Sequence, residues 1–305
     1  MILGFLPVDS FNVIVLAAVF VLVATGLHFT FGMLNVVNLV HGELILIGAY
    51  TTLQMQRTTG NVLLGMALAP LVAAAIGVAM ERGVLRFLYD RPLDSLLATF
   101  GLSVIIRQVV QFIFSPNPQI VRSPIGGSFL LAGFNIPWWR LIIVLVTGGL
   151  IIGVIGFLGR SRFGLHARGT VANPRLAETM GINSGFVRAG LFALGSAIAG
   201  LAGAMLAPIS TLNPQFGLLF LVNSFLVVII GGKGSLRGLV VAGIVLGGTL
   251  AALQFVMSTV LAQILILAIA IIGVRLRPLL GLLRESNRDP GSIATYSDPI
   301  YPQNS

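Results

Sequence analysis

The sequence contains no cysteine, and only 9% of its 305 residues are charged. Without cysteine the chain has no disulfide, no thiolate metal ligand and no cysteine nucleophile. Soluble domains carry about 25% charged residues, so this little charge cannot cover a water-facing surface of the chain's size. A soluble globular protein is therefore excluded. A disordered chain is excluded as well, because 56% of the residues are hydrophobic. Strictly alternating segments are scarce, which argues against an outer-membrane barrel.

Long apolar stretches fill most of the chain instead. A helix needs about 20 apolar residues to cross a hydrocarbon core of about 30 Å, and the chain offers about nine candidates. They run over 11–28, 36–55, 61–80, 96–114, 138–158, 187–207, 216–231, 238–257 and 261–275. The pattern predicts an all-α fold, a polytopic transmembrane helix bundle. The stretch 216–231 is short and 28–38 is broken by Gly32, Asn35 and Asn38, so one or two helices should be discontinuous.

Basic residues outnumber acidic ones by 18 to 9, which gives a net charge of +9. In membrane proteins Lys and Arg gather in the loops that face the cytoplasm, so we attribute the charge to topology and predict no binding of nucleic acid. One side of the predicted bundle holds only Arg57, Arg122 and Arg140. The other side holds Arg82, Arg86, Arg91, Arg160, Arg162, Arg168, Arg175, Arg188, Lys233, Arg237, Arg275, Arg277, Arg284 and Arg288. This asymmetry predicts an N-terminus outside and a C-terminus in the cytoplasm.

One domain boundary follows from the composition. Residues 1–284 form the transmembrane domain, and the polar segment 285–305 is expected to be a mobile cytoplasmic tail. The outer loop 115–137 is rich in Pro and Gly, which favours an irregular cap over a helix.

The longest internal loop, 159–186, contains a helix signal of its own. Asn173 suits the N-cap, Pro174 suits the first helical position, and Gly181 suits the left-handed residue that ends a helix. A helix of about two turns is marginal alone in water, so we expect it to dock against something. Two alternatives remain open: an interfacial helix on the lipid headgroups, or a docking helix for a cytosolic partner.

The docking alternative is the sharper one, because Leu176 and Met180 lie four residues apart on one face of this helix. The chain lacks the phosphate-cradling pattern G-x-x-x-x-G-K-[ST], so any ATP hydrolysis must come from another polypeptide. The residues assigned to docking are Arg168, Asn173, Pro174, Leu176, Glu178, Met180 and Gly181.

Polar residues also occur within the predicted spans. Asn35, Asn38 and His41 are spaced three apart, so on a helix they would line one face and present neutral donors and acceptors to a solute. If a helix begins near Gly42, Glu43 falls in its first turn, where the helix dipole favours a carboxylate. A polar cluster inside lipid indicates a functional site, but hydrogen bonding between helices is an equally good explanation. A catalytic constellation is absent, and no catalytic residue or metal ligand is assigned.

A second polar group lies in the span 96–114. Arg107, Gln108 and Gln111 occur there together. Arg107 is expected to snorkel towards the membrane surface or to pair inside the bundle, and a direct contact with substrate is the less favoured alternative. The small residues of 195–203 form a stripe that permits close packing of helices.

Several segments resemble one family. GMLNVVNLVHGELILIGAY at 32–50 is similar to the N-x-x-H-G-E region of the branched-chain amino acid and urea permeases of ATP-binding-cassette importers. GLHARGTVANPRLAETMGIN at 164–183 resembles the cytoplasmic loop of that family, and GGKGSLRGLVVAGIVLGG at 231–248 its late glycine-rich segment. The similarity covers nearly the whole chain except the tail.

Within the family, the sequence patterns favour the urea branch. Residues 91–103, followed by Arg107 and Gln108, are similar to the urea-permease pattern, and so are residues 223–232. Lys233 and the segment 277–282 depart from that pattern. The favoured substrate is urea or a related short amide. A branched-chain amino acid is the alternative within the family, and a passive channel for small neutral solutes is the alternative from another class.

The resemblance implies a permease without enzymatic activity or cofactor, in the inner (plasma) membrane of a bacterium. It implies four kinds of partner: membrane lipid, a second homologous permease subunit, two cytosolic ATPase subunits and an extracytoplasmic solute-binding protein. The loop helix would match the coupling helix that sits in a cleft of the ATPase. The expected substrate-pathway residues are Asn35, Asn38, His41, Glu43, Gln108 and Gln111.

Overall fold

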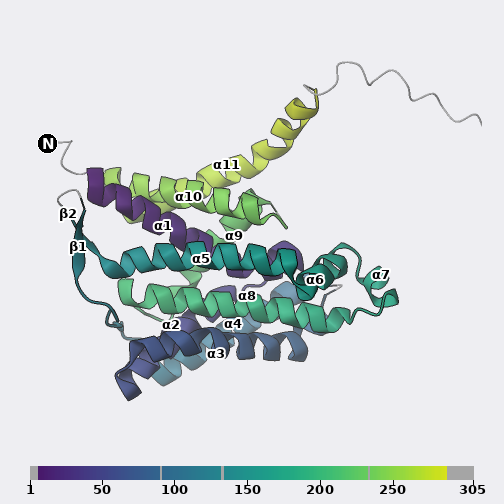
Figure 1. Cartoon of the computed structure of the whole chain (residues 1–305), viewed down its shortest axis with the longest axis horizontal. Helices are drawn as coiled ribbons and strands as arrows, with labels where there is room; N and C mark the ends of the chain where they lie inside the picture. The colour runs from purple at the N-terminus through teal and green to yellow at the C-terminus, as the bar shows by residue number, and fades with distance from the viewer. Residues whose placement is uncertain (1–5, 90, 132–133, 233, 287–305) are drawn as a thin grey trace, which may run out of the picture.

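The computed structural model describes residues 6–89, 91–131, 134–232 and 234–286 (Figure 1). The predicted tail 285–305 lies outside these residues except for its first two, which belong to the last helix, and Lys233 lies outside them too. The helices are α1 (Leu6–Leu27), the π-helix η1 (His28–Met33), α2 (His41–Thr59), α3 (Val62–Gly83), η2 (Leu85–Phe87), α4 (Pro92–Phe114), α5 (Trp138–Arg160), α6 (Arg162–Ala172), α7 (Pro174–Thr179), α8 (Ser184–Leu206), η3 (Ala207–Ile209), α9 (Phe216–Gly231), α10 (Leu236–Val256) and α11 (Thr259–Ser286).

The long helices lie side by side, as an all-α bundle requires. In Figure 1, α5 and α8 cross the middle of the molecule, with α3 and α4 on one side of them and α1 and α10 on the other. The hairpin β1–β2 lies at one end of the bundle and α6 and α7 lie at the other. The prediction of a helical bundle is confirmed.

Six helices in the described part of the chain are long and apolar enough to cross a membrane. They are Phe11–Met33, Val62–Phe87, Pro92–Phe114, Trp138–Arg160, Ser184–Ile209 and Leu236–Val256. Three further predicted spans correspond to shorter or more polar helices: α2, α9 and the apolar part of α11, Thr259–Gly273. The sequence predicts discontinuity for two of these places, the chain before α2 and α9, but it predicts the stretch within α11 as an ordinary span.

Small residues bring α8 into backbone contact with its neighbours. A methyl group added at Gly195 would lie 2.7 Å from the carbonyl oxygen of Gly26 in α1, and one at Gly200 would lie 2.6 Å from that of Ala69 in α3. A methyl group at Gly203 would lie 1.9 Å from the carbonyl oxygen of Ile45 in α2. Only glycine fits at such distances, so the stripe 195–203 fixes α1, α2 and α3 around α8, as expected for close helix packing.

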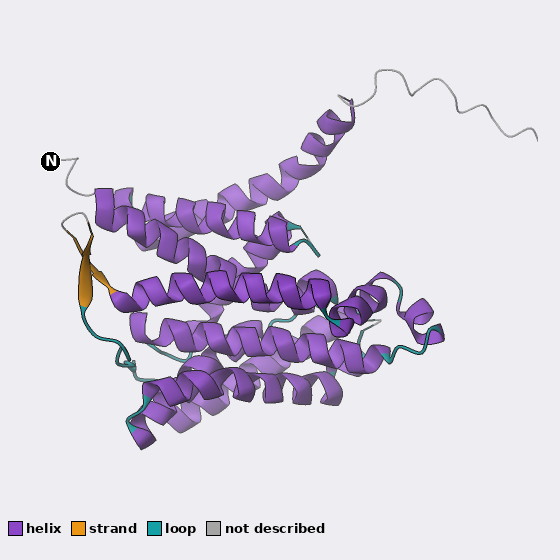
Figure 2. Ribbon diagram, viewed as in Figure 1, coloured by secondary structure: helices purple, strands orange, loops and turns teal. Residues whose placement is uncertain are grey.

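One local expectation was wrong and two were incomplete. Residues 35–38 are not helical, and Asn35 has a φ of +57°, so α2 begins at His41 rather than at 36. The outer loop contains a two-stranded antiparallel hairpin, β1 (Ser128–Leu131) and β2 (Phe134–Pro137), drawn in orange in Figure 2. The internal loop contains α6 in addition to the predicted helix, because Ser161 caps α6 by accepting a hydrogen bond from the N–H of Gly164 at 2.9 Å.

Candidate functional site

The first residues of α2 lie in the middle of the bundle. His41 Nε2 is 2.9 Å from the carbonyl oxygen of Val23 in α1, and Ser103 Oγ in α4 is 3.0 Å from Glu43 Oε1. Val23 and Ser103 both lie near the midpoints of helices that are long enough to span a membrane. The chain after η1 therefore turns back inside the bundle, and α2 starts partway across it.

The start of α9 meets the start of α2. A methyl group added at Gly217 would lie 2.0 Å from the carbonyl oxygen of Gly42, and one at Gly42 would lie 2.6 Å from the carbonyl oxygen of Gly217. Glycine at both positions is what allows the two helix ends to touch. Because the N-terminal turn of a helix carries a partial positive charge, two such ends converge beside Glu43.

Glu43 and Arg107 form an ion pair at this depth. Arg107 Nη2 lies 2.5 Å from Glu43 Oε1, and Arg107 Nε lies 3.2 Å from the same oxygen. Ser103 Oγ donates to Glu43 Oε1 and accepts from Arg107 Nη2 at 3.1 Å. The Glu43 side chain is 1% exposed and that of Arg107 is 20% exposed. Arg107 therefore pairs inside the bundle and does not snorkel. The first-turn position predicted for Glu43 is confirmed.

Several buried polar atoms near the start of α2 lack hydrogen-bond partners. Asn38 Nδ2, His41 Nδ1 and Glu43 Oε2 are all buried and unpaired. A carbonyl oxygen only accepts, so His41 Nε2 carries the proton and its unpaired Nδ1 is an acceptor in the neutral ring. Unpaired buried polar groups are unfavourable unless a ligand or water meets them. Three such unpaired atoms lie within six residues of the chain, and a polar solute would supply their missing hydrogen-bond partners.

The other predicted pathway residues are distributed more widely. Asn35 lies on the exposed part of the loop before α2. On α4, Gln108 is exposed and Gln111 is half-buried. The structure therefore brings Asn38, His41 and Glu43 together with Arg107 and Ser103, while the predicted alignment of Asn35, Asn38 and His41 along one helix face is wrong because 35–38 is not helical.

An apolar groove continues from the ion pair towards the β-hairpin end of the bundle. It has a volume of about 410 Å³ and lies between α2, α3 and α4. Ile47 and Tyr50 follow Glu43 at intervals of one and two turns on the same face of α2, and Val110 follows Arg107 on α4. The hydroxyl of Tyr50 is buried without a hydrogen-bond partner. Neither Ser103 nor Tyr50 was predicted as a site residue, because a single Ser or Tyr in an apolar stretch carries no spacing signal.

The loop helix forms where the sequence predicts it. Asn173 Oδ1 accepts from the N–H of Leu176 at 3.0 Å, Pro174 opens α7, and Gly181 has a φ of +80°. Leu176 and Met180 are 58% and 75% exposed. Ala177 is buried, and its carbonyl oxygen accepts from the N–H of Ile182 at 3.0 Å, which closes the turn after α7. In Figure 1, α7 extends beyond the end of the bundle.

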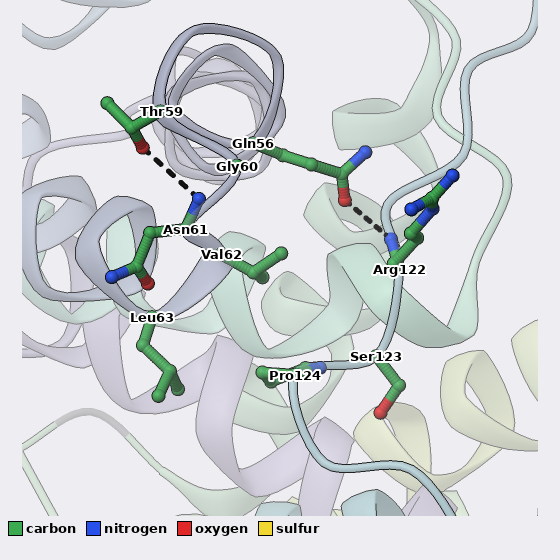
Figure 3. A pocket seen from close by; sticks show the side chains of 9 residues that line it. All are labelled: Gln56, Thr59, Gly60, Asn61, Val62, Leu63, Arg122, Ser123 and Pro124. Carbon is green, nitrogen blue, oxygen red and sulfur yellow. Dashed lines mark hydrogen bonds between the residues drawn. The ribbon is translucent and has the colours of Figure 1, made fainter.

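A polar cavity of about 710 Å³ opens at the end of the bundle opposite α7, at the turn between α2 and α3 (Figure 3). Gln56 Oε1 accepts from the backbone N–H of Arg122 at 2.6 Å, and Thr59 Oγ1 accepts from the N–H of Asn61 at 3.2 Å. The first contact fixes the outer loop against the end of α2, and the second lies within the turn between α2 and α3. The cavity is separate from the Glu43–Arg107 pair.

Outside the spans, Tyr89 occupies the short connection between α3 and α4. Its hydroxyl donates to Glu81 Oε1 at 3.0 Å, and the guanidinium carbon of Arg188 lies 4.7 Å from the ring centroid. Burial, reinforced by the nearby Glu81 carboxylate, raises the pKa of the Tyr89 phenol above its ordinary value. The tyrosine thus joins α3 to α8 as a neutral hydrogen-bond donor.

A helical bundle with several membrane-crossing helices, a half-crossing helix and unpaired polar atoms at mid-depth defines a polytopic membrane transport protein. Residues 10–274 match the family described as "Branched-chain amino acid transport system / permease component". The chain belongs to this family of permease components.

Individual relatives agree with this assignment. The chain is 27% identical over 252 residues to the high-affinity branched-chain amino acid transport system permease protein BraD of Pseudomonas aeruginosa, covering 77% of this chain and 82% of the relative. It is 26% identical over 286 residues to the permease protein LivH of the corresponding Escherichia coli system, covering 88% and 93%. It is 27% identical over 248 residues to the probable branched-chain amino acid transport permease protein LivH of Methanocaldococcus jannaschii, covering 77% and 76%. No solved structure matches the chain.

Proposed function

We propose that this chain is the membrane-spanning subunit of an ATP-driven importer for branched-chain amino acids. The observation that carries the proposal is the set of permease relatives named for branched-chain amino acid transport. The family alternative therefore replaces urea, which the sequence patterns at 91–103 and 223–232 favoured.

The ion pair supports the same choice of substrate. A zwitterionic amino acid has a carboxylate for Arg107 and an ammonium for Glu43, whose Oε2 is unpaired. Urea has neither charge and would need only neutral donors and acceptors. The groove lined by Ile47, Tyr50 and Val110 offers apolar contact to a branched aliphatic side chain.

The route through this subunit follows the facing surfaces of α2 and α4. A guanidinium at mid-depth is expensive to expose to lipid tails, and the Arg107 side chain is 20% exposed. Its exposed part, with Gln108 beside it, should therefore face water or a second membrane subunit. Asn35, Asn38, His41 and Gln111 are proposed to line the same route.

α7 is proposed to act as the docking helix for an ATPase. Leu176 and Met180 present apolar surface at the end of the bundle that carries most of the arginines, which we assign to the cytoplasm. Arg168 in α6 and Glu178 in α7 belong to the same internal loop, 159–186, and both are exposed. Movement of α7 on closure of the nucleotide-binding subunits would shift α6 and α8 and so change access to the α2–α4 route.

The proposed partners follow from the family. They are a second homologous permease, two cytosolic ATPases and an extracytoplasmic solute-binding protein. The N-terminus is proposed to lie outside and the C-terminus in the cytoplasm of a bacterial cell.

The experiment that tests this function begins with the solute-binding protein that the proposal requires. Its affinities for leucine and urea are measured by calorimetry, and uptake of both solutes is then measured in vesicles that hold the assembled transporter. We expect leucine binding and ATP-dependent accumulation of leucine. Accumulation of urea instead of leucine would contradict the substrate, and flux in liposomes containing this chain alone without ATP would favour the passive channel.

A further inference from the structure

A second cavity lies at the end of the bundle that carries α7, and the transport route does not use it. It has a volume of about 410 Å³ and lies between η1, the end of α5, α6 and the start of α10. Its wall includes Met33, Ile155 and Leu158, and its polar side chains include His28, Arg168 and Arg237. Most of the wall is aliphatic, while its charged groups are cationic.

The positive charge in this cavity is not neutralised by the surrounding side chains. No Asp or Glu is among the described residues that line it. Arg168 donates one N–H to the carbonyl oxygen of Leu158, which leaves other guanidinium N–H groups available. Arg237 is exposed and makes no ion pair within the described part of the chain.

The start of α10 adds a further favourable site for an anion. Ser235 caps this helix by accepting from the N–H of Gly238 at 3.0 Å. The preceding N–H groups, those of Leu236 and Arg237, lie in the first turn, where a helix offers no internal acceptor. The positive end of a helix of 21 residues therefore points at the cavity.

A buried histidine contributes to the wall of the same cavity. His28 contributes to the wall of the cavity and is 1% exposed, yet its Nδ1 has no hydrogen-bond partner. A methyl group added at Gly32 would lie 2.7 Å from this Nδ1, so the nitrogen packs against its own helix and the imidazole closes one side of the cavity. The arginines, the helix start and His28 come from three separate segments, so no single local motif accounts for their meeting.

We infer that this cavity binds the phosphate of an anionic phospholipid headgroup. A lipid is a better fit than a free phosphate ion because the aliphatic wall continues onto the exposed face of α5, where Ile152 and Ile155 are 73% and 49% exposed. A headgroup held by Arg168 and Arg237 would have its acyl chains beside this apolar surface. It would also bridge α6, which leads into α7, and η1, which leads towards α2.

Native mass spectrometry of the full chain, purified in detergent, tests this inference. The probes are phosphatidylglycerol, phosphatidylcholine and inorganic phosphate. The wild-type chain is expected to retain phosphatidylglycerol in preference to phosphatidylcholine. The double variant R168Q/R237Q should bind phosphatidylglycerol about thirtyfold more weakly, because each basic residue near a membrane surface contributes about 1 kcal/mol to such binding.

The matched control is R162Q/R175Q, which removes two exposed arginines from the same end of the chain but outside the cavity. Its lipid binding should equal that of the wild-type chain. R237Q alone changes an exposed residue, should weaken binding about fivefold, and separates loss of the site from loss of fold. Unchanged binding in R237Q and in the double variant would overturn the inference, as would displacement of phosphatidylglycerol by an equal concentration of inorganic phosphate.

Discussion

The starts of α2 and α7 are opposites in their relation to solvent. α2 begins inside the bundle with polar atoms that find no partner, at Asn38, His41 and Glu43. α7 begins beyond the bundle and exposes the apolar side chains of Leu176 and Met180. Buried polar atoms and exposed apolar side chains are each unfavourable in the isolated chain. Both regions therefore lack a partner in the isolated chain. The start of α2 needs a polar solute or water, and α7 needs an apolar protein surface.

The largest effect is expected when the buried ion pair is broken. R107Q leaves the Glu43 carboxylate buried without its cation, and removal of one partner from a buried pair costs about 3–5 kcal/mol. E43Q should cost less, because Arg107 is partly exposed. Thermal unfolding of the purified chain measures both effects, with R57Q at the exposed end of α2 as the control. Equal midpoints for R107Q and R57Q would show that the pair does not stabilise the site.

The second effect concerns the exposed apolar side chains of α7. L176E places a charge on the apolar face of α7, and loss of one buried leucine contact is worth about 1.5–3 kcal/mol. Association with the ATPase should therefore weaken by about ten- to a hundredfold, with membrane insertion unchanged. H166E adds the same charge to an exposed position of α6 and is the control. Co-purification of the ATPase at normal yield with L176E would refute the docking role.

A smaller effect is expected from the N-cap of α7. N173A removes the acceptor for the N–H of Leu176, and loss of an N-cap costs about 1 kcal/mol. Because α7 has only 6 residues, this should lower ATPase association severalfold. N183A removes the corresponding cap, which accepts from the N–H of Phe186, from the 23-residue α8. Similar association for N173A and N183A in a pull-down would mean that helicity of α7 does not matter for docking.

The smallest effect concerns the buried polar groups around Glu43. S103A removes one hydroxyl between Glu43 and Arg107, and such hydrogen bonds between membrane helices average about 0.6 kcal/mol. Leucine uptake should show a KM raised about two- to threefold. S196A removes a buried hydroxyl that bonds only within its own helix, to the carbonyl oxygen of Phe192, and should leave KM unchanged. An equal shift of KM in both variants would mean that the hydrogen bonds of Ser103 to Glu43 and Arg107 do not matter for transport.

The sequence predicted those features that depend on local patterns. Hydropathy located the helices, and Asn173, Pro174 and Gly181 located α7, because caps act over a few residues. The position of Glu43 in the first turn of α2 also followed from a local signal, the break before Gly42.

Other features depend on contacts between distant segments and could not be predicted in this way. The partner of Arg107 was not evident, because Glu43 is 64 residues away in the chain. The contact between Gly42 and Gly217 arises from the packing of α2 against α9, and the groove beside Tyr50 from the packing of α2, α3 and α4, neither of which hydropathy encodes. The helical alignment of Asn35 with Asn38 failed because spacing alone does not reveal where a helix begins.

In the proposed transporter, the face of α4 beside the Glu43–Arg107 pair lines an aqueous route. The absence of cysteine allows a direct test, in which single cysteines are introduced as Q108C and, on the exposed apolar face of α5, as I152C. The rate of reaction with a charged, membrane-impermeant thiol reagent is measured with and without leucine. We expect Q108C to react, leucine to slow this reaction, and I152C to stay unreactive. Equal reactivity at the two positions, or an unreactive Q108C, would contradict it.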